Sequence, residues 1–238
     1  MPERDSITLE NVTIVSVNGR DPQNSLAAIA HSSRQLRFAE QLLVTNRECS
    51  RVGVRTVVVP GLSSISEYNG FVVKELHRHI RTSHCLIVQP DGFVVTPRLW
   101  TDFFLRYDYI GAPWNMVCSW EALAKCGMSS RQGIHVLVGN GGFSLRSKRF
   151  LEATASFDYD GSALAEDCFV ALKIRSDLES MGMRYAPVDL ARQFSLETYI
   201  DNGSILGQHF GFHGKFPHFS QYLAITDPTA AALQKSFP

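Results

Sequence analysis

The chain is organised around one stretch, Val138-Gly139-Asn140-Gly141-Gly142-Phe143-Ser144-Leu145-Arg146-Ser147. An apolar run over residues 134–138 leads into it, and a basic segment suited to a helix follows it. Glycine loses more backbone freedom on folding than any other residue, so this cluster of glycines indicates a chain that turns tightly or closely approaches another group. We expect a strand end whose backbone faces a ligand, with Phe143 and Leu145 in the core behind it. The alternative is a tight turn between two packed elements.

The composition indicates a soluble globular protein of the cytosol. Of its 238 residues, 45% are hydrophobic and 19% are charged, and the formal net charge is +0, so no overall field attracts nucleic acid. No apolar run approaches the roughly 20 residues that span a bilayer, and the N-terminus lacks the layout of a signal peptide. Five cysteines without a Cys-x-x-Cys pair argue against a disulfide framework or a zinc site. We expect a cytoplasmic location and no nucleic-acid partner.

Strand-like and helical segments alternate along the chain. Strands are predicted over residues 12–17, 41–44, 55–59, 85–88 and 184–188, and helices over residues 25–38, 66–80 and 167–178. Asn24 or Ser25 is expected to cap the first helix. This alternation predicts one α/β domain with a mainly parallel sheet flanked by helices. Its core is expected to span residues 10–215, with a tail over residues 216–238.

Polar or glycine-rich residues follow several of the predicted strands. In α/β sheets, ligands bind beyond the carboxyl ends of the strands. Residues 17–18, 89–91 and 139–142 all lie at strand ends, so we expect them to converge on one cleft. Residues 118–132 are polar and poorly periodic, and we expect them to form a mobile loop over that cleft.

Three carboxylates and one histidine could carry chemistry at this cleft. Asp91 follows a strand and precedes a glycine, so it can hold a divalent cation that grips phosphates, or it can simply complete a Pro-Asp-Gly turn. Glu166 and Asp167 open a predicted helix, where they can complement the helix dipole or supply a general base. His213 lies between glycines 211 and 214 near the end of the core, and it is a metal ligand, a phosphate donor or a structural residue.

Several stretches together resemble a known family. They are Leu86-Ile87-Val88-Gln89-Pro90-Asp91-Gly92, Tyr107-Asp108-Tyr109-Ile110-Gly111-Ala112-Pro113-Trp114, the glycine-rich stretch quoted above, Glu166-Asp167 and Phe212-His213-Gly214. The chain is similar in these to a family of uncharacterised bacterial and fungal proteins, the domain of unknown function 5672, which is classed with glycosyltransferases of the GT-A fold. The resemblance extends from the first strand to about His213.

The resemblance implies a Rossmann-like sheet that binds a nucleotide-sugar together with Mn²⁺ or Mg²⁺ held by an Asp-x-Asp motif. Gln89-Pro90-Asp91 matches this motif, but Gln89 replaces its first carboxylate, so metal binding that is weak or absent is an alternative. The resemblance implies Asp91 and His213 as metal ligands and Asp167, with Glu166 second, as the catalytic base. The other implied contacts are with the donor, through Val17, Asn18, Arg20, Gln89, Asp91 and Lys215, and with the acceptor or sugar, through Trp114, Asn140, Gly141 and Gly142. Arg20 and Lys215 are expected to contact phosphates, and a solvated surface charge is the alternative for each.

The expected function is transfer of a sugar from a nucleotide-sugar, with a UDP-sugar as the expected donor, to a glycan or lipid-linked saccharide in polysaccharide biosynthesis. Such an enzyme is expected in the cytoplasm, with peripheral association at the inner face of the membrane as an alternative. A non-catalytic, sugar- or protein-binding module with the same fold also stays open, because Gln89 replaces a carboxylate. A nucleotidyltransferase is a weaker alternative, because Val17-Asn18-Gly19-Arg20 is poor in glycine.

Overall fold

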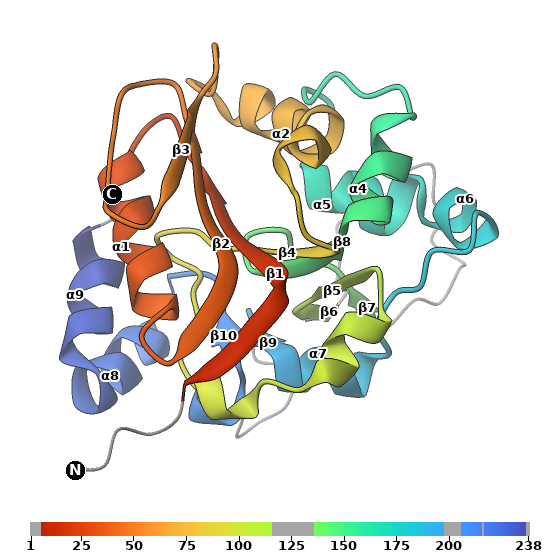
Figure 1. The fold of residues 1–238 in the computed structure, drawn as a ribbon. Helices are drawn as coiled ribbons and strands as arrows, with labels where there is room; N and C mark the ends of the chain where they lie inside the picture. The colour runs from red at the N-terminus through yellow and green to blue at the C-terminus, as the bar shows by residue number, and fades with distance from the viewer. Residues whose placement is uncertain (1–5, 116–135, 198–205, 216, 237–238) are drawn as a thin grey trace.

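The computed structural model describes residues 6–115, 136–197, 206–215 and 217–236. A six-stranded sheet in the order β3-β2-β1-β4-β8-β5 forms its centre (Figure 1). The strands are β1 (Ile7–Val17), β2 (Leu36–Thr45), β3 (Arg55–Val58), β4 (His84–Ile87), β5 (Tyr109–Gly111) and β8 (Ser144–Ser147). Strands β1 to β4 run parallel, whereas β8 is antiparallel to both β4 and β5. The mainly parallel α/β sheet expected from the sequence is confirmed.

Helices cover both faces of this sheet, because its strands are apolar on both sides. Successive side chains of a strand point to opposite faces. In β1, Ile14 accordingly packs with Leu26 of α1, whereas Val15 packs with Val72 of α2. In Figure 1, α1 (Pro22–Ser32), α8 (Pro217–Thr226) and α9 (Pro228–Ser236) lie on one side of the sheet, and α2 (Ile65–Lys74), α4 (Lys148–Ala155) and α5 (Glu166–Cys168) lie on the other.

Smaller elements complete the described part of the chain. Two short ladders lie outside the main sheet. One is antiparallel, between β6 (Pro113–Asn115) and β7 (Val136–Val138), and the other is parallel, between β9 (Ser195–Leu196) and β10 (Gly211–Phe212). The remaining helices are α6 (Arg175–Ser180), α7 (Val188–Phe194), the 3₁₀ helices Leu76–His79, Pro97–Leu99, Asp102–Arg106 and Leu206–Gln208, and a π-helix over Phe169–Lys173.

The first helix and second strand differ from the prediction. Helix α1 begins at Pro22, and its N-cap is Asp21, whose side chain accepts the N–H of Asn24; the expectation of Asn24 or Ser25 was wrong. Proline suits the first helical position because the N–H it lacks has no partner within the helix. The helix ends at Ser32, and β2 begins at Leu36. Burial alternates over residues 36–39, which is the period of a strand and not of a helix.

Two later elements also differ. The helix predicted over residues 167–178 is interrupted by the π-helix, in which the N–H of Ile174 donates to the carbonyl of Phe169 at 3.1 Å. The strand predicted over residues 184–188 is reduced to one bridge between Tyr185 and Tyr109. Pro187 has no N–H to continue a ladder, and α7 begins directly after it. The loop expected over residues 118–132 lies outside the described residues.

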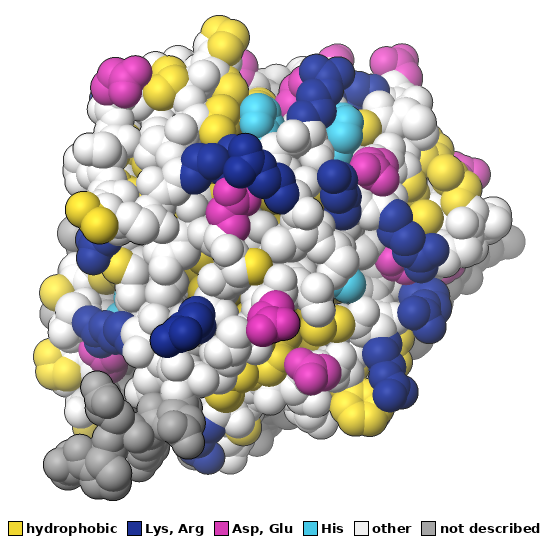
Figure 2. All heavy atoms as spheres, viewed as in Figure 1, with side chains coloured by type: hydrophobic (Ala, Val, Ile, Leu, Met, Phe, Trp, Pro, Cys, Tyr) yellow, Lys and Arg dark blue, Asp and Glu magenta, His cyan; other side chains and the backbone are white. Residues whose placement is uncertain are grey.

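The surface carries paired charges. Figure 2 shows several Lys and Arg side chains beside Asp and Glu side chains on one face of the molecule. Glu40, for example, lies 2.6 Å from Arg55 and 3.6 Å from Arg81. The Arg81 side chain is 72% exposed, so its pair contributes little to stability, whereas Arg55 and Glu40 are only 25% and 17% exposed. Among the described residues, no helix has both the length and the apolar character needed to cross a membrane.

Candidate functional site

A cavity of about 350 Å³ opens where β1 and β4 end. The N-terminal end of α2 forms another of its walls. The lining residues are Val17, Asn18, Gly19, Arg20, Leu62, Ser64, Ile65, Tyr68, Gln89, Pro90, Asp91 and His213. All of the expected donor contacts except Lys215 therefore lie on one cavity, together with His213. Lys215 is exposed, two residues beyond His213, and is outside the lining.

The third predicted strand end, residues 139–142, lies against this site and not in the cavity lining. Asn140 adopts a left-handed backbone conformation with φ of 58°, which asparagine tolerates better than most residues. Its side-chain Oδ1 accepts the N–H of Phe143 at 3.1 Å, and its carbonyl accepts the Tyr109 hydroxyl at 3.0 Å. Phe143 and Leu145 are fully buried behind the turn, as predicted.

Two glycines of this turn are required by neighbouring side chains. A Cβ on Gly141 would lie 1.7 Å from Glu166 Oε1, and a Cβ on Gly142 would lie 2.2 Å from His213 Nε2. No side chain fits at either position without displacing a polar group of the site. The close approach predicted for the turn is thus an approach by the protein's own side chains, and an acceptor contact at Gly141 and Gly142 remains a prediction.

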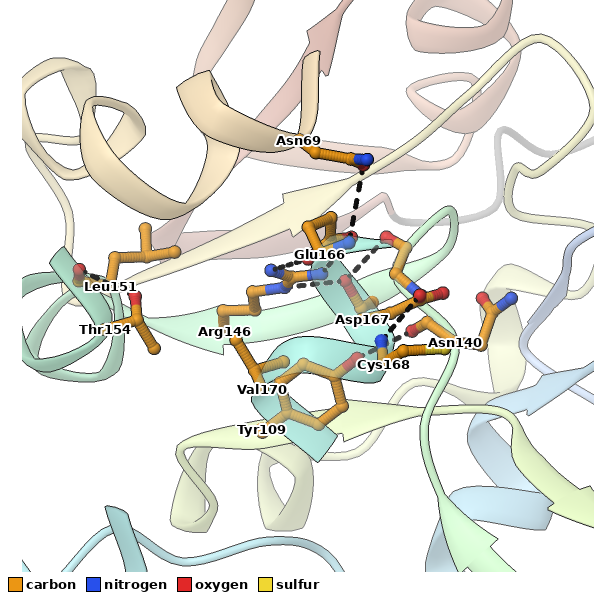
Figure 3. A network of polar contacts seen from close by, with 12 residues as sticks. Asn69, Tyr109, Asn140, Arg146, Leu151, Thr154, Glu166, Asp167, Cys168 and Val170 are labelled. Carbon is orange, nitrogen blue, oxygen red and sulfur yellow. Dashed lines mark hydrogen bonds and ion pairs between the residues drawn. The ribbon is translucent and has the colours of Figure 1, made fainter. Parts of the chain in front are cut away.

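Glu166 forms a buried ion pair beneath the turn (Figure 3). Its two carboxylate oxygens accept from Arg146 at 2.7 and 2.8 Å, and the side chains of Glu166 and Arg146 are only 4% and 1% exposed. The backbone N–H of Glu166 also donates to Asn69 Oδ1 at 3.4 Å. Because both oxygens are occupied in a closed pair, this environment favours a structural role for Glu166 over its predicted second place as a base.

Asp167 occupies a different environment, although it is the next residue (Figure 3). Its carboxylate accepts the N–H of Gly141 at 3.0 Å and that of Cys168 at 2.8 Å. Burial, and then the negative charge of Glu166, raise its pKa to about 6, against the smaller opposing effect of the Gly141 N–H. A carboxylate with a pKa near neutrality can exchange a proton with a substrate.

His213 lies between two sets of polar groups. Its Nε2 is 3.1 Å from Gln89 Oε1 and 3.8 Å from Asp91 Oδ1, and its Nδ1 is 3.1 Å from Glu197 Oε1. Burial opposes the charged imidazolium, but the hydrogen bond with Glu197 and the charge of Asp91 together raise the His213 pKa above its usual value. The Gln89 amide is oriented, because its Nε2 donates to the Tyr68 hydroxyl at 2.9 Å.

These groups suit a cation at Asp91. The atom Asp91 Oδ1 is buried and has no hydrogen-bond partner among the described residues. Asp91 Oδ1 and Gln89 Oε1 both lie near His213 Nε2, at 3.8 and 3.1 Å. Adjacent ligands of an octahedral cation with bonds of about 2.1 Å stand about 3 Å apart. Within the described part of the chain, no three His, Cys, Asp or Glu side chains gather into a metal site, so Asp91 and His213 would share a cation with the Gln89 amide and with non-protein ligands.

Glu197 and Tyr68 belong to this arrangement but were not predicted. The Glu197 carboxylate accepts from the Trp114 indole N–H and from Asn140 Nδ2. The position of Glu197 directly after the short strand β9 is the one local signal that could have suggested it. Tyr68 lies on α2, and its helix pattern gives no sign that its hydroxyl reaches Gln89.

The buried pair predicts a stability difference. We expect Glu166→Gln to lower the free energy of unfolding by about 3–5 kcal/mol, because it leaves the Arg146 charge buried and uncompensated. Urea denaturation measures this loss. The matched control is Glu179→Gln, which removes the Arg175–Glu179 pair on the surface of α6 and should cost less than about 1 kcal/mol. Similar small losses in both variants would contradict the structural role of Glu166.

Comparison with family models identifies the family of the chain. The family model described as "Protein of unknown function (DUF5672)" matches residues 51–213, and no curated protein matches the chain. A similar solved structure is the galactosyltransferase LgtC in complex with donor and acceptor sugar analogs, with 14% sequence identity and a TM-score of 0.45 over 94% of this chain and 95% of that one. Because the family model covers more than half of the sequence, the chain belongs to the DUF5672 family.

Proposed function

We propose that the protein is a divalent-metal-assisted glycosyltransferase that takes a sugar from a nucleotide-sugar, with a UDP-sugar as the first candidate, and transfers it to a hydroxyl of a glycan or lipid-linked saccharide. One observation carries the proposal. At a cavity where β1 and β4 end, the buried Asp91 Oδ1 has no hydrogen-bond partner among the described residues and lies 3.8 Å from His213 Nε2. The proton-accepting candidate Asp167 lies in α5 and accepts the N–H of Gly141 in the neighbouring glycine turn.

The donor side of the proposal uses the cavity. Nucleotides of α/β proteins bind beyond the carboxyl ends of the strands, and Val17, Asn18 and Arg20 line this end of the cavity. Arg20 adds a positive charge for the phosphates. Asp91 and His213 would hold Mn²⁺ or Mg²⁺, with Gln89 as a neutral oxygen ligand. Bound there, the cation would act as a Lewis acid and stabilise the charge of the departing diphosphate.

The acceptor side of the proposal uses Asp167. The acceptor hydroxyl oxygen forms a bond to the anomeric carbon, the bond from that carbon to the diphosphate oxygen breaks, and the hydroxyl proton moves to the Asp167 carboxylate. Two backbone N–H groups hold this carboxylate in place, so it need not reorganise to accept the proton. Trp114 and Asn140, joined through Glu197, are candidates to contact the sugar.

A non-catalytic binding module is the second candidate. The observation that favours it is Gln89, which replaces a carboxylate and is engaged with both Tyr68 and His213. A module of this kind would bind a sugar or protein partner without turnover. Transfer from any sugar donor would exclude it.

The proposed function is tested by a thermal-shift screen of UDP-, GDP-, CMP- and dTDP-sugars, each with Mn²⁺ and with EDTA. A ligand that binds only the folded state stabilises it by about 2.7 kcal/mol at a hundredfold excess over Kd. We expect one nucleotide to raise the melting temperature with Mn²⁺ and not with EDTA. A shift that persists in EDTA would retain nucleotide binding and remove the metal role of Asp91 and His213. Absence of any shift would favour the binding module.

We expect Asp91→Asn to abolish the EDTA-sensitive part of donor binding, because it removes the negative charge that faces His213. The melting temperature without ligand should stay nearly unchanged, since asparagine also suits a Pro-Asp-Gly turn. Asp160→Asn is the matched control, because Asp160 lies in an exposed turn outside this cavity, where its Oδ1 accepts the N–H of Ser162. A large loss of stability with intact binding would identify Asp91 as a turn residue only.

We expect Asp167→Asn to lower the rate of transfer by about 10²–10⁴-fold, the usual contribution of a general base, while donor binding is kept. In the wild-type protein, a base must be deprotonated to act. Because the Asp167 pKa is raised to about 6, kcat/KM should rise with pH through about 6 and then level off. Steady-state kinetics from pH 5 to pH 8 measure this. Wild-type rates in Asp167→Asn would exclude Asp167 as the base.

A further inference from the structure

Glu197 joins three segments that are far apart in the sequence. Its Oε2 accepts from the indole N–H of Trp114, in the middle of β6. Its Oε1 accepts from Asn140 Nδ2 at 2.6 Å and lies 3.1 Å from Nδ1 of His213, which directly follows β10. The Glu197 side chain is 19% exposed, so most of it is shielded from competing water.

Two of the groups around Glu197, the Trp114 indole and the Asn140 amide, are donors, and the Asn140 Nδ2 also lies 2.9 Å from Nδ1 of His213. The indole nitrogen of Trp114 can only donate. The Asn140 amide is oriented by the bond from the Phe143 N–H to its Oδ1, so its Nδ2 must face Glu197. A carboxylate has lone pairs for several donors at once. Glutamine has nearly the same shape, but it has a single acceptor oxygen and turns an NH₂ group toward other donors.

The Nδ1 side of His213 determines what its Nε2 presents to the cavity. When Nδ1–H donates to a carboxylate, the ring orientation is held and the Nε2 of the neutral ring keeps its lone pair. In this structure, Nε2 faces Asp91 Oδ1 and Gln89 Oε1. The packing of the ring against Gly142, where a Cβ would lie 2.2 Å from Nε2, limits the ring from the other direction.

We propose that Glu197 is a positioning residue, which fixes the His213 imidazole toward Asp91 and at the same time fixes the Trp114 indole. The indole ring lies against Gly139, where a Cβ would meet its ring carbons at 2.3 Å. The Glu197 carboxylate thus orients His213 on the donor side of the site and the Trp114 ring on the acceptor side. This inference deepens the proposed function. Only the expected effect of Glu197 on nucleotide binding rests on that function.

The test compares Glu197→Gln with Glu152→Gln, a matched change at an exposed position on α4. Two quantities are measured: the indole ¹H–¹⁵N signal of Trp114, assigned with Trp114→Phe, and the Kd for UDP with Mn²⁺. We expect Glu197→Gln to move the Trp114 signal and to raise Kd by about 10–100-fold, the usual effect of losing a partner of a metal-binding histidine. Glu152→Gln should change neither.

A double-mutant cycle shows whether Glu197 acts through His213. In a His213→Ala background, Glu197→Gln should raise Kd by less than about threefold, because the group that it positions is already absent. An equal loss of affinity in both backgrounds, or an unmoved Trp114 signal, would overturn the proposal. If Glu197→Gln does not fold, Glu197→Asp replaces it with the same two measurements. If the wild-type protein binds no nucleotide, the proposed function fails, while the Trp114 signal still decides the role of Glu197.

Discussion

The buried pair between Arg146 and Glu166 is the interaction on which the candidate site depends. It joins β8 to the start of α5, two elements separated in the chain by α4 and an irregular loop. A charged pair without water is stable only when its geometry satisfies both partners, and here two parallel bonds at 2.7 and 2.8 Å do so. Because Glu166 is held in this way, the next residue, Asp167, is brought to the N–H of Gly141. The ion pair therefore sets the position of the candidate base.

The glycine turn connects this ion pair with the opposite side of the site. Gly141 leaves room for Glu166, and Gly142 leaves room for His213. The buried Glu166 carboxylate and the cavity-lining His213 imidazole can therefore both approach the backbone of this turn. Asn140, which precedes both glycines, extends the contact to Glu197. The turn is thus a packing solution for polar side chains, and that accounts for its glycine content.

Two features of the site do not serve folding. The Asp167 carboxylate lies where burial and the charge of Glu166 disfavour its ionised form, and Asp91 Oδ1 is buried without a hydrogen-bond partner among the described residues. A protein that only had to be stable would avoid both, because buried polar groups are normally satisfied. Such groups concentrate at functional sites. Asp91 lines the cavity and Asp167 lies on the far side of the glycine turn that packs against His213, which is the physical reason to look for function there.

The sequence by itself determined the alternation of strands and helices, the mainly parallel sheet, and the convergence of residues 17–18 and 89–91 at one edge of it. These follow from local periodicity and from the rule that parallel strands end at the same edge. It also identified Asp91, Asp167 and His213 as candidates, through their positions near strand ends and glycines. It misplaced the end of α1 and the strand at residues 184–188, since local pattern alone assigns short apolar segments poorly.

Only the tertiary structure decided how these candidates differ. Glu166 and Asp167 are neighbours with the same chemistry. No sequence pattern could show that Arg146, 20 residues before Glu166, pairs with Glu166 and not with Asp167, or that the charge of Glu166 raises the pKa of Asp167. In the same way, Glu197 meets Trp114 across 83 residues and Asn140 across 57. Hydrogen bonds between segments so distant depend on the packing of the whole sheet and its helices. The roles of single polar side chains were therefore fixed by three-dimensional contacts, whereas the sheet itself followed from local order.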